Sequence, residues 1–358
     1  MKKINILTAG LISPNSYAFL HPIIASKKKL IKYNINIEIF YKIEPKIYDC
    51  NVLIIESKFY SKLWSNKKEK IFKELENFNS RIDKLCFYSI GDSSTFDHAM
   101  MLPYIDFYFK NQILDNKKLY LNSFYGNRYY SNYYFNHNKV VDESPVYSKP
   151  VEDIKDLVKI KLGWNSSLVN WSLYSPIKLK INSKFNFLFS MNNLGKFIPP
   201  KKYRRIPVSI RFNTNYKYKS VSYQREYIKS SVKLKYSTNK INRINYFKEL
   251  MNTKVVISPF GLGEITLKDF EVFLTGGLLV KPTMKHMITW PNLFIEDETY
   301  ISCSLDLNDL NDKIEYCLDN YNSLIQIAEN GQELYKSYNI YNKNNYKFCD
   351  YFSNIMKF

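Results

Sequence analysis

Strand-like and helix-like stretches alternate along this chain, and the alternation runs through it twice. In the first half, apolar runs typical of strands occupy 4–8, 35–41, 51–56, 85–90 and 105–109, with helical patterns at 16–33 and 67–78. In the second half, strand patterns occupy 185–190, 207–212, 255–258 and 278–280, with helical patterns at 221–234, 244–251, 267–274 and 307–320. Strands that alternate with helices of this length predict parallel sheets joined by crossover helices, and therefore the α/β class.

The length of the chain favours two such units. A single hydrophobic core stops growing near roughly 250 to 300 residues, and this chain has 358. Its hydrophobic content of 45% and aromatic content of 16% are enough to fill ordered cores. The pattern predicts a first domain at 1–185, a second at 186–335, and a helical tail at 336–358 that packs back on the first domain.

The chain is strongly basic, with a formal net charge of +19. Lys, Asn, Ile, Tyr and Phe are all abundant, and all have A/T-rich codons, so part of this basicity is consistent with genome composition. A positive surface attracts phosphorylated small molecules, anionic lipid headgroups, acidic glycans or nucleic acid. The alternative is a set of solvated lysine faces without a specific partner, and composition alone leaves both open.

Several classes of protein are disfavoured. The five cysteines form no CxxC pair, which predicts unpaired thiols in a reducing compartment, and the four histidines form no metal-ligand cluster. No apolar run reaches about 18 residues, and the basic start is not followed by a signal-peptide core. The sequence therefore predicts a cytoplasmic protein without metal or cofactor, whose basic surface can contact the inner face of a membrane peripherally.

The most informative segment is SPFGLGEITLKDFEVFLTGGLLVKP at 258–282. It reads as a strand, a glycine turn, a helix start, a second glycine turn and a strand. Gly261 and Gly263 allow backbone geometry closed to other residues and the close approach of a ligand. Thr266 is suited to cap the helix, with Asp269 three residues on as its partner.

Lys268 and Glu271 are three residues apart, so they share one face near this helix start. Free N–H groups and the helix dipole at such an end favour phosphate. A cation beside the phosphates and a carboxylate one turn on suit a nucleoside diphosphate with its ribose hydroxyls. The alternative is an ordinary strand–helix–strand unit with a surface Lys–Glu pair.

This segment resembles the donor site of GT-B glycosyltransferases, above all exostosin-like and spore-coat-type bacterial enzymes. Their pattern reads Ser-Pro-x-Gly-x-Gly, a basic residue, Glu and Gly-x-x-x-Val. The segment is also similar to Ile-Thr-Leu-Arg-x-x-Glu of phage DNA β-glucosyltransferases, with Lys268 in place of the arginine. The resemblance implies a GT-B fold, in which two Rossmann-like domains face each other across a cleft, the first binding the acceptor and the second the nucleotide sugar.

The resemblance also implies roles for individual residues. Glu271 would hold the nucleotide ribose, and Lys268 would face the diphosphate. Arg225, in the run Gln-Arg-Glu at a helix start, corresponds to an arginine that binds the diphosphate. Asp92 ends the run Phe-Tyr-Ser-Ile-Gly-Asp of a first-domain strand, where the inverting phage enzymes carry the catalytic base.

Asp92 has two interpretations. A carboxylate at the C-terminal end of a parallel strand faces the ligand crevice and can take the proton of an acceptor hydroxyl. It can instead cap a turn or a helix that begins at 93–94, in which case Asp97 and His98 are alternatives for the base. Arg211, which follows a second-domain strand, is a further diphosphate candidate or a member of a surface or interdomain salt bridge.

The sequence also departs from related patterns. Many retaining GT-B enzymes have two glutamates eight residues apart, whereas Glu264 and Glu271 are seven apart, so Glu264 receives no role. No Asp-x-Asp pair is present, which argues against a metal-dependent GT-A enzyme. The aromatic stretch at 125–135 is expected to be packed core, with stacking on sugars or bases as the alternative.

These features together predict an inverting, metal-independent glycosyltransferase. Its co-substrate would be a nucleotide-diphosphate sugar, and its acceptor a cell-surface glycan or lipid-linked glycan. One alternative is a DNA-modifying glucosyltransferase, which would use the positive charge on duplex phosphates. The other is a non-catalytic protein that binds nucleotides or glycans on the same scaffold, since a fold alone never proves activity.

Overall fold

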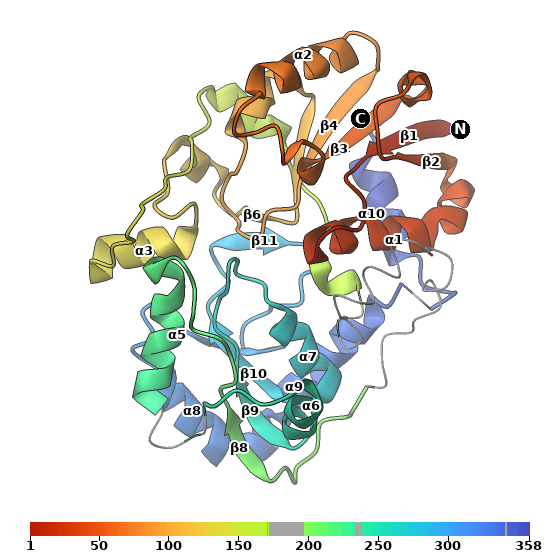
Figure 1. Cartoon of the computed structure of the whole chain (residues 1–358). Coiled ribbons are helices and arrows are strands. Elements are labelled where there is room, and N and C mark those ends of the chain that lie inside the picture. The colour runs from red at the N-terminus through yellow and green to blue at the C-terminus, as the bar shows by residue number, and fades with distance from the viewer. Residues whose placement is uncertain (170, 172–196, 233–235, 237, 341) are drawn as a thin grey trace.

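The computed structural model describes residues 1–169, 171, 197–232, 236, 238–340 and 342–358, and it contains two α/β halves (Figure 1). Each half is built on its own parallel sheet, which confirms the predicted fold class of two Rossmann-like domains. The predicted strand at 185–190 and the predicted domain boundary at 185/186 lie outside the described residues.

The first domain contains a six-stranded sheet with the order β2-β1-β3-β4-β5-β7, and every neighbouring pair is parallel. Its strands are β1 (Lys2–Leu7), β2 (Ile35–Phe40), β3 (Val52–Glu56), β4 (Lys84–Ser89), β5 (Phe107–Lys110) and β7 (Ile160–Leu162). The strand order reverses between β1 and β3. In sheets of this kind, ligands bind outside the carboxyl ends of the strands near such a reversal.

Helices α1 (Pro14–Leu30), α2 (Lys68–Asn79) and α3 (Tyr129–Asn138) belong to this domain. Ser13 caps α1, because its Oγ accepts a hydrogen bond from the Ser16 N–H at 3.1 Å. Helix α10 (Lys347–Ile355), near the C-terminus, lies beside α1 (Figure 1). The Tyr33 hydroxyl donates to Asp350 at 2.5 Å, so the tail that follows the second domain is bound to the first.

The second domain contains a four-stranded parallel sheet with the order β12-β10-β9-β8. Its strands are β8 (Ile206–Ser209), β9 (Thr253–Ile257), β10 (Leu278–Pro282) and β12 (Ile301–Cys303). Its helices are α5 (Lys219–Val232), α6 (Arg243–Leu250), α7 (Leu267–Thr275), α8 (Leu310–Asp319) and α9 (Tyr321–Ser337). Every residue of β10 is buried, as expected for a strand inside a parallel sheet.

One small sheet joins the two halves. Strand β6 (Gln112–Leu114) of the first half pairs antiparallel with β11 (Met287–Thr289) of the second, and the pair lies between the domains in Figure 1. Asp142 reinforces the connection by accepting from the backbone N–H and the hydroxyl of Ser220, both at 2.8 Å, near the start of α5. The domains are thus held together by backbone pairing as well as by side chains.

The region at 114–184, where the sequence shows no regular alternation, contains one α-helix, one further strand of the first sheet and several short 3-10 helices within its described part. Helix α3 lies there, and β7 forms the sixth strand of the first sheet. A strand of three residues is too short to give a periodic signal, which is why the sequence did not reveal it. Among the described residues, no helix combines the length and the apolar character that crossing a bilayer requires.

Candidate functional site

A cavity of about 260 Å³ lies where α7 begins, at the carboxyl ends of β8 and β9. Five of the seven residues predicted to bind the donor lie in its wall: Arg211, Arg225, Thr266, Lys268 and Glu271. The rest of the wall consists of Phe212, Tyr246, Ser258, Pro259 and Leu267. The structure thus gathers in one cavity residues that are up to 60 positions apart, counted from 211 to 271.

The first turn of α7 is shaped by the predicted capping pair. Asp269 accepts from the Thr266 N–H at 2.8 Å and from the Ser258 hydroxyl at 2.5 Å. The Nζ of Lys281 on β10 lies 3.0 Å from Oδ2 of the same carboxylate, and both side chains are fully buried. Lys281 therefore balances the negative charge that Asp269 brings to the helix start, which leaves that end suited to an anion.

Lys268 lies in the wall of this cavity, between the rings of Phe212 and Tyr246, whose centroids are 5.4 and 5.8 Å from its Nζ. The Nζ donates to the carbonyl of Ile257 at 3.3 Å. The side chain is half-buried, and the loss of hydration lowers the pKa of Lys268 to about 7. An anion bound beside it would restore the charged form.

Glu271, one turn further along α7, also lines the cavity. The Tyr246 hydroxyl donates to its Oε2 at 3.0 Å, and the Arg243 guanidinium lies 3.5 Å from its Oε1. Glu271 is 8% exposed, and burial raises the pKa of Glu271 against the opposing effect of Arg243 and the Tyr246 hydrogen bond. A carboxylate held in this way can accept hydrogen bonds from ligand hydroxyls.

Arg225 on α5 reaches the cavity beside the glycine-rich segment. Its Nε donates to the carbonyl of Phe260 at 2.6 Å, and its Nη1 donates to the carbonyl of Asn213 at 2.9 Å. A Cβ atom at Gly261 would lie only 3.2 Å from Nη2. A side chain at 261 would therefore crowd this guanidinium, which would have to move by a few tenths of an ångström, and the φ of Gly261 is not in the left-handed region.

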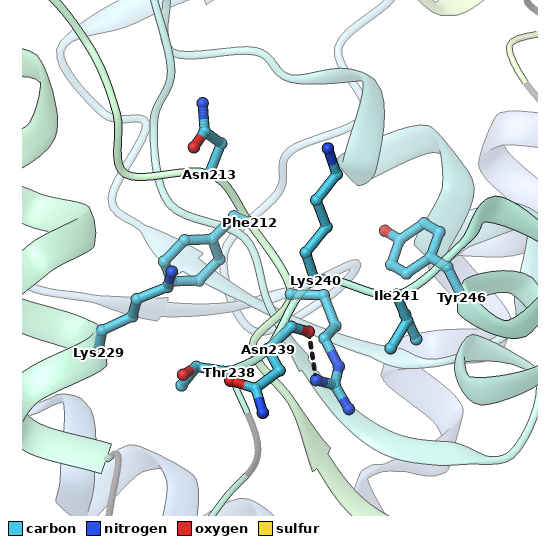
Figure 2. A pocket seen from close by; sticks show the side chains of 9 residues that line it. Phe212, Asn213, Lys229, Thr238, Asn239, Lys240, Ile241 and Tyr246 are labelled. Atoms are coloured by element: carbon cyan, nitrogen blue, oxygen red, sulfur yellow. Dashed lines mark hydrogen bonds between the residues drawn. The ribbon is translucent and has the colours of Figure 1, made fainter.

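Arg211 lies in the same wall, but its charge is balanced within the protein. Its Nε and Nη2 donate to both oxygens of Glu249 at 2.8 to 3.1 Å, and its Nη1 donates to the carbonyl of Asn239 at 2.5 Å (Figure 2). The sequence left open a diphosphate ligand or a surface or interdomain salt bridge. The observed ion pair lies within the second domain, so Arg211 acts as part of the wall.

Gly263, which the sequence assigned to donor binding, is not among the residues that line the cavity. A Cβ atom there would lie 1.8 Å from the carbonyl oxygen of Asp92, so the residue must be glycine for the first domain to approach. The same carbonyl accepts a hydrogen bond from the side chain of Gln112. The glycine-rich segment thus lies between this cavity and the loop that carries Asp92.

The Asp92 side chain is exposed, and its Oδ1 accepts from the Asn15 amide at 2.8 Å. Desolvation by the surrounding protein raises the pKa of Asp92 despite that hydrogen bond and nearby Arg128 and Lys58. No helix begins at 93–94 within this described stretch, and the next helical turn is Ala99–Tyr104. The predicted alternative of a helix-capping Asp92 is therefore wrong.

The two alternatives for the base are placed differently. Asp97 accepts from the Ser89 hydroxyl at 3.2 Å and lies 3.7 Å from the buried ammonium of Lys110. The His98 ring packs on Trp64, with centroids 4.2 Å apart, and burial lowers the pKa of His98. Both residues are engaged in the packing of the first domain.

Glu264, to which the sequence gave no role, links the domains. It is fully buried, and the Ser94 N–H and hydroxyl donate to it at 3.0 and 2.6 Å. His286 lies 3.5 Å away and stacks on Tyr129. Burial alone would raise the pKa of Glu264, but the contacts with His286 and Ser94 lower it. Both of its oxygens are thus held inside the protein.

Sequence reasoning missed Phe212 and Tyr246, which form much of the cavity wall. Aromatic residues are so frequent in this chain that neither stood out.

A second cavity, of about 410 Å³, lies next to the first and shares Arg211, Phe212 and Tyr246 with it (Figure 2). Within the described part of the chain, no group of three or more His, Cys, Asp or Glu is arranged to hold a metal ion.

No protein-family model and no curated protein sequence matches the chain. Among solved structures, it is similar to HepE of Anabaena in complex with UDP-glucose, with 10% identity, a TM-score of 0.45 and coverage of 99% of this chain and 100% of that one. A glycosyltransferase from Rickettsia africae gives 11% identity, a TM-score of 0.45 and 99% coverage of both chains. An α-glucosyltransferase in complex with UDP and a 13-mer DNA gives 11% identity, a TM-score of 0.43 and full coverage of both chains. Glycosyltransferase structures are thus among those that this chain resembles.

Proposed function

We propose that this protein is a glycosyltransferase that moves a sugar from a nucleotide-diphosphate donor to a glycan or lipid-linked acceptor. The observation that carries the proposal is the grouping of Arg225, Lys268 and the first turn of α7 in one cavity with Glu271. Two cations and free backbone N–H groups suit a diphosphate, and the carboxylate suits the ribose hydroxyls. The net charge of +19 suits an anionic acceptor.

The proposed reaction is a single displacement. Asp92 takes the proton of the acceptor hydroxyl as its oxygen attacks the anomeric carbon. The bond between that carbon and the phosphate oxygen breaks, and its electron pair leaves with the diphosphate. Lys268, Arg225 and the α7 N–H groups stabilise the charge on this leaving group, so the chain itself supplies the electrostatic stabilisation. The anomeric configuration is inverted.

The donor-site assignment predicts that Lys268→Ala weakens binding of the best nucleotide sugar about 10- to 100-fold, the usual cost of a hydrogen bond to a charged group. Glu271→Ala is expected to weaken it about 10-fold. Isothermal titration calorimetry on the folded variants measures both effects. Glu333→Ala, on the exposed face of α9, removes a carboxylate far from the cavity and serves as the matched control.

Unchanged affinity in both cavity variants would overturn the donor-site assignment. Tight donor binding without transfer to any acceptor would instead favour the non-catalytic alternative. Binding to duplex DNA that weakens steeply with salt, together with transfer to that DNA, would favour the DNA-modifying alternative.

The lowered pKa of Lys268 predicts a pH dependence of donor binding. With a pKa of about 7, Lys268 is charged below neutral pH and neutral above it. The diphosphate of a nucleotide sugar does not titrate in this range, so donor affinity is expected to be highest below pH 7 and to fall as the pH rises towards 9. Titrations at several pH values measure this. Lys268→Arg keeps its charge throughout and should flatten the profile; the same decline in that variant would contradict the prediction.

A further inference from the structure

The second cavity lies beyond the donor cavity, on the side away from the glycine-rich segment. The two cavities share Arg211, Phe212 and Tyr246. The residues found only in the second cavity are Asn213, Lys229, Thr238, Asn239, Lys240 and Ile241. No residue of the glycine-rich segment or of α7 lines it, so the three shared residues form the boundary between the two cavities.

The order of groups along the two cavities matches the order of groups in a nucleotide sugar. Arg225 lies beside Gly261 of the glycine-rich segment, and Lys268 lies near the rings of Phe212 and Tyr246. The diphosphate is proposed to bind at these two cations. Glu271, proposed to hold the ribose, is hydrogen-bonded to the Tyr246 hydroxyl at 3.0 Å. The ring of Tyr246 also lines the second cavity. The group that follows the ribose, which is the base, would therefore enter that cavity.

The lining of the second cavity has a definite chemistry. Phe212 and Tyr246 offer aromatic faces for stacking. Lys229 on α5 and Lys240 before α6 approach from different parts of the wall, with Phe212 between them in Figure 2. No carboxylate lines the cavity, and neither lysine has an ion pair among the described residues. Both ammonium groups can therefore donate to a ligand.

We propose that this cavity binds a pyrimidine base with two carbonyl oxygens, uracil or thymine, and that it selects the donor by this base. Lys229 and Lys240 each donate to one carbonyl while the ring stacks on an aromatic wall. Cytosine and guanine each have one carbonyl oxygen, and adenine has none. Their ring nitrogens can also accept from a lysine, but each of these bases carries an exocyclic amino group, and an ammonium cannot accept a hydrogen bond from that group. The inference rests on the proposed function, because it assumes a nucleotide donor in the first cavity.

Calorimetric titration of the full chain with UDP, dTDP, CDP, GDP and ADP tests the proposal. We expect UDP or dTDP to bind about 10-fold more tightly than CDP and GDP, and about 100-fold more tightly than ADP, if each charged hydrogen bond contributes its usual amount. The comparison of UDP with dTDP shows whether the cavity has room for the methyl group of thymine.

The double variant Lys229→Met/Lys240→Met is expected to lose most of the preference for UDP over ADP, with ADP affinity unchanged. Lys248→Met, an exposed residue of α6 outside both cavities, is the matched control and should keep the preference. Equal binding of ADP and UDP, or an unchanged preference in the double variant, would overturn this inference and leave the proposed function standing. Failure of all five nucleotides to bind would overturn both.

Discussion

Asp92→Asn is expected to lower sugar transfer about 10²- to 10⁴-fold, the usual contribution of a general base, while donor affinity stays unchanged. Asparagine keeps the oxygen that accepts from Asn15, and the backbone contacts of Asp92 with Gln112 and Gly263 do not involve the carboxylate. The variant therefore loses the proton acceptor and little else.

Transfer rate, donor affinity and melting temperature of the same preparation separate the possible outcomes. Asp115→Asn, an exposed first-domain aspartate that follows β6, makes the same charge change and should leave all three unchanged. Near-normal transfer by Asp92→Asn would exclude this residue as the base and remove the main support for inversion. Product stereochemistry by NMR is the independent check on inversion.

Lys281→Met is expected to destabilise the second domain by about 3 to 5 kcal/mol, the usual cost of leaving one buried charge without its partner. Asp269 and Lys281 are both completely buried, and desolvation lowers the pKa of Lys281 against the opposing effect of Asp269. Without Lys281, the Asp269 carboxylate keeps only its contacts with Ser258 and Thr266. Chemical denaturation followed by circular dichroism measures the loss.

The rescue variant is Lys281→Met/Asp269→Asn, in which neither buried group is charged. The amide oxygen can still accept from Ser258 or Thr266, so most of the lost stability should return. Wild-type stability of the single Lys281→Met variant would show that water or another group already compensates Asp269. Failure of the double variant to recover would show that the carboxylate is needed for the shape of the α7 turn itself.

The fold was largely predictable because its information is local. Apolar runs such as those of β1, β3 and β4 are buried on both faces, and their composition alone distinguishes them from the helices. The start of α7 was predictable for the same reason, since Thr266 and Asp269 act within one turn. The three-residue strands β6 and β11 were not, because they are defined only by pairing with each other across the domains.

The candidate site was predictable where its residues lie close together in sequence. Lys268 and Glu271 share a helix face, and the structure places both in one cavity. The contacts of Glu264 with Ser94, of Glu271 with Tyr246, and of Gly263 with Asp92 join residues between 25 and 171 positions apart. The spacing of 171 is the difference between 263 and 92. No periodicity in the sequence reports contacts over such separations, so the approach of Gly263 to Asp92 could not be predicted.

The position of α10 has a consequence for how the protein is made. Phe348 and Phe352 of α10 pack on Trp164, whose Nε1 donates to the Phe19 carbonyl on α1. A ribosome therefore finishes the entire second domain before it supplies the helix that covers this part of the first. At about 5 to 20 residues per second, the aromatic surface around Trp164 stays open to water for on the order of ten seconds or more. The domain whose synthesis begins first is thus the last to be completed, and the nascent chain is most exposed to aggregation or chaperone binding there.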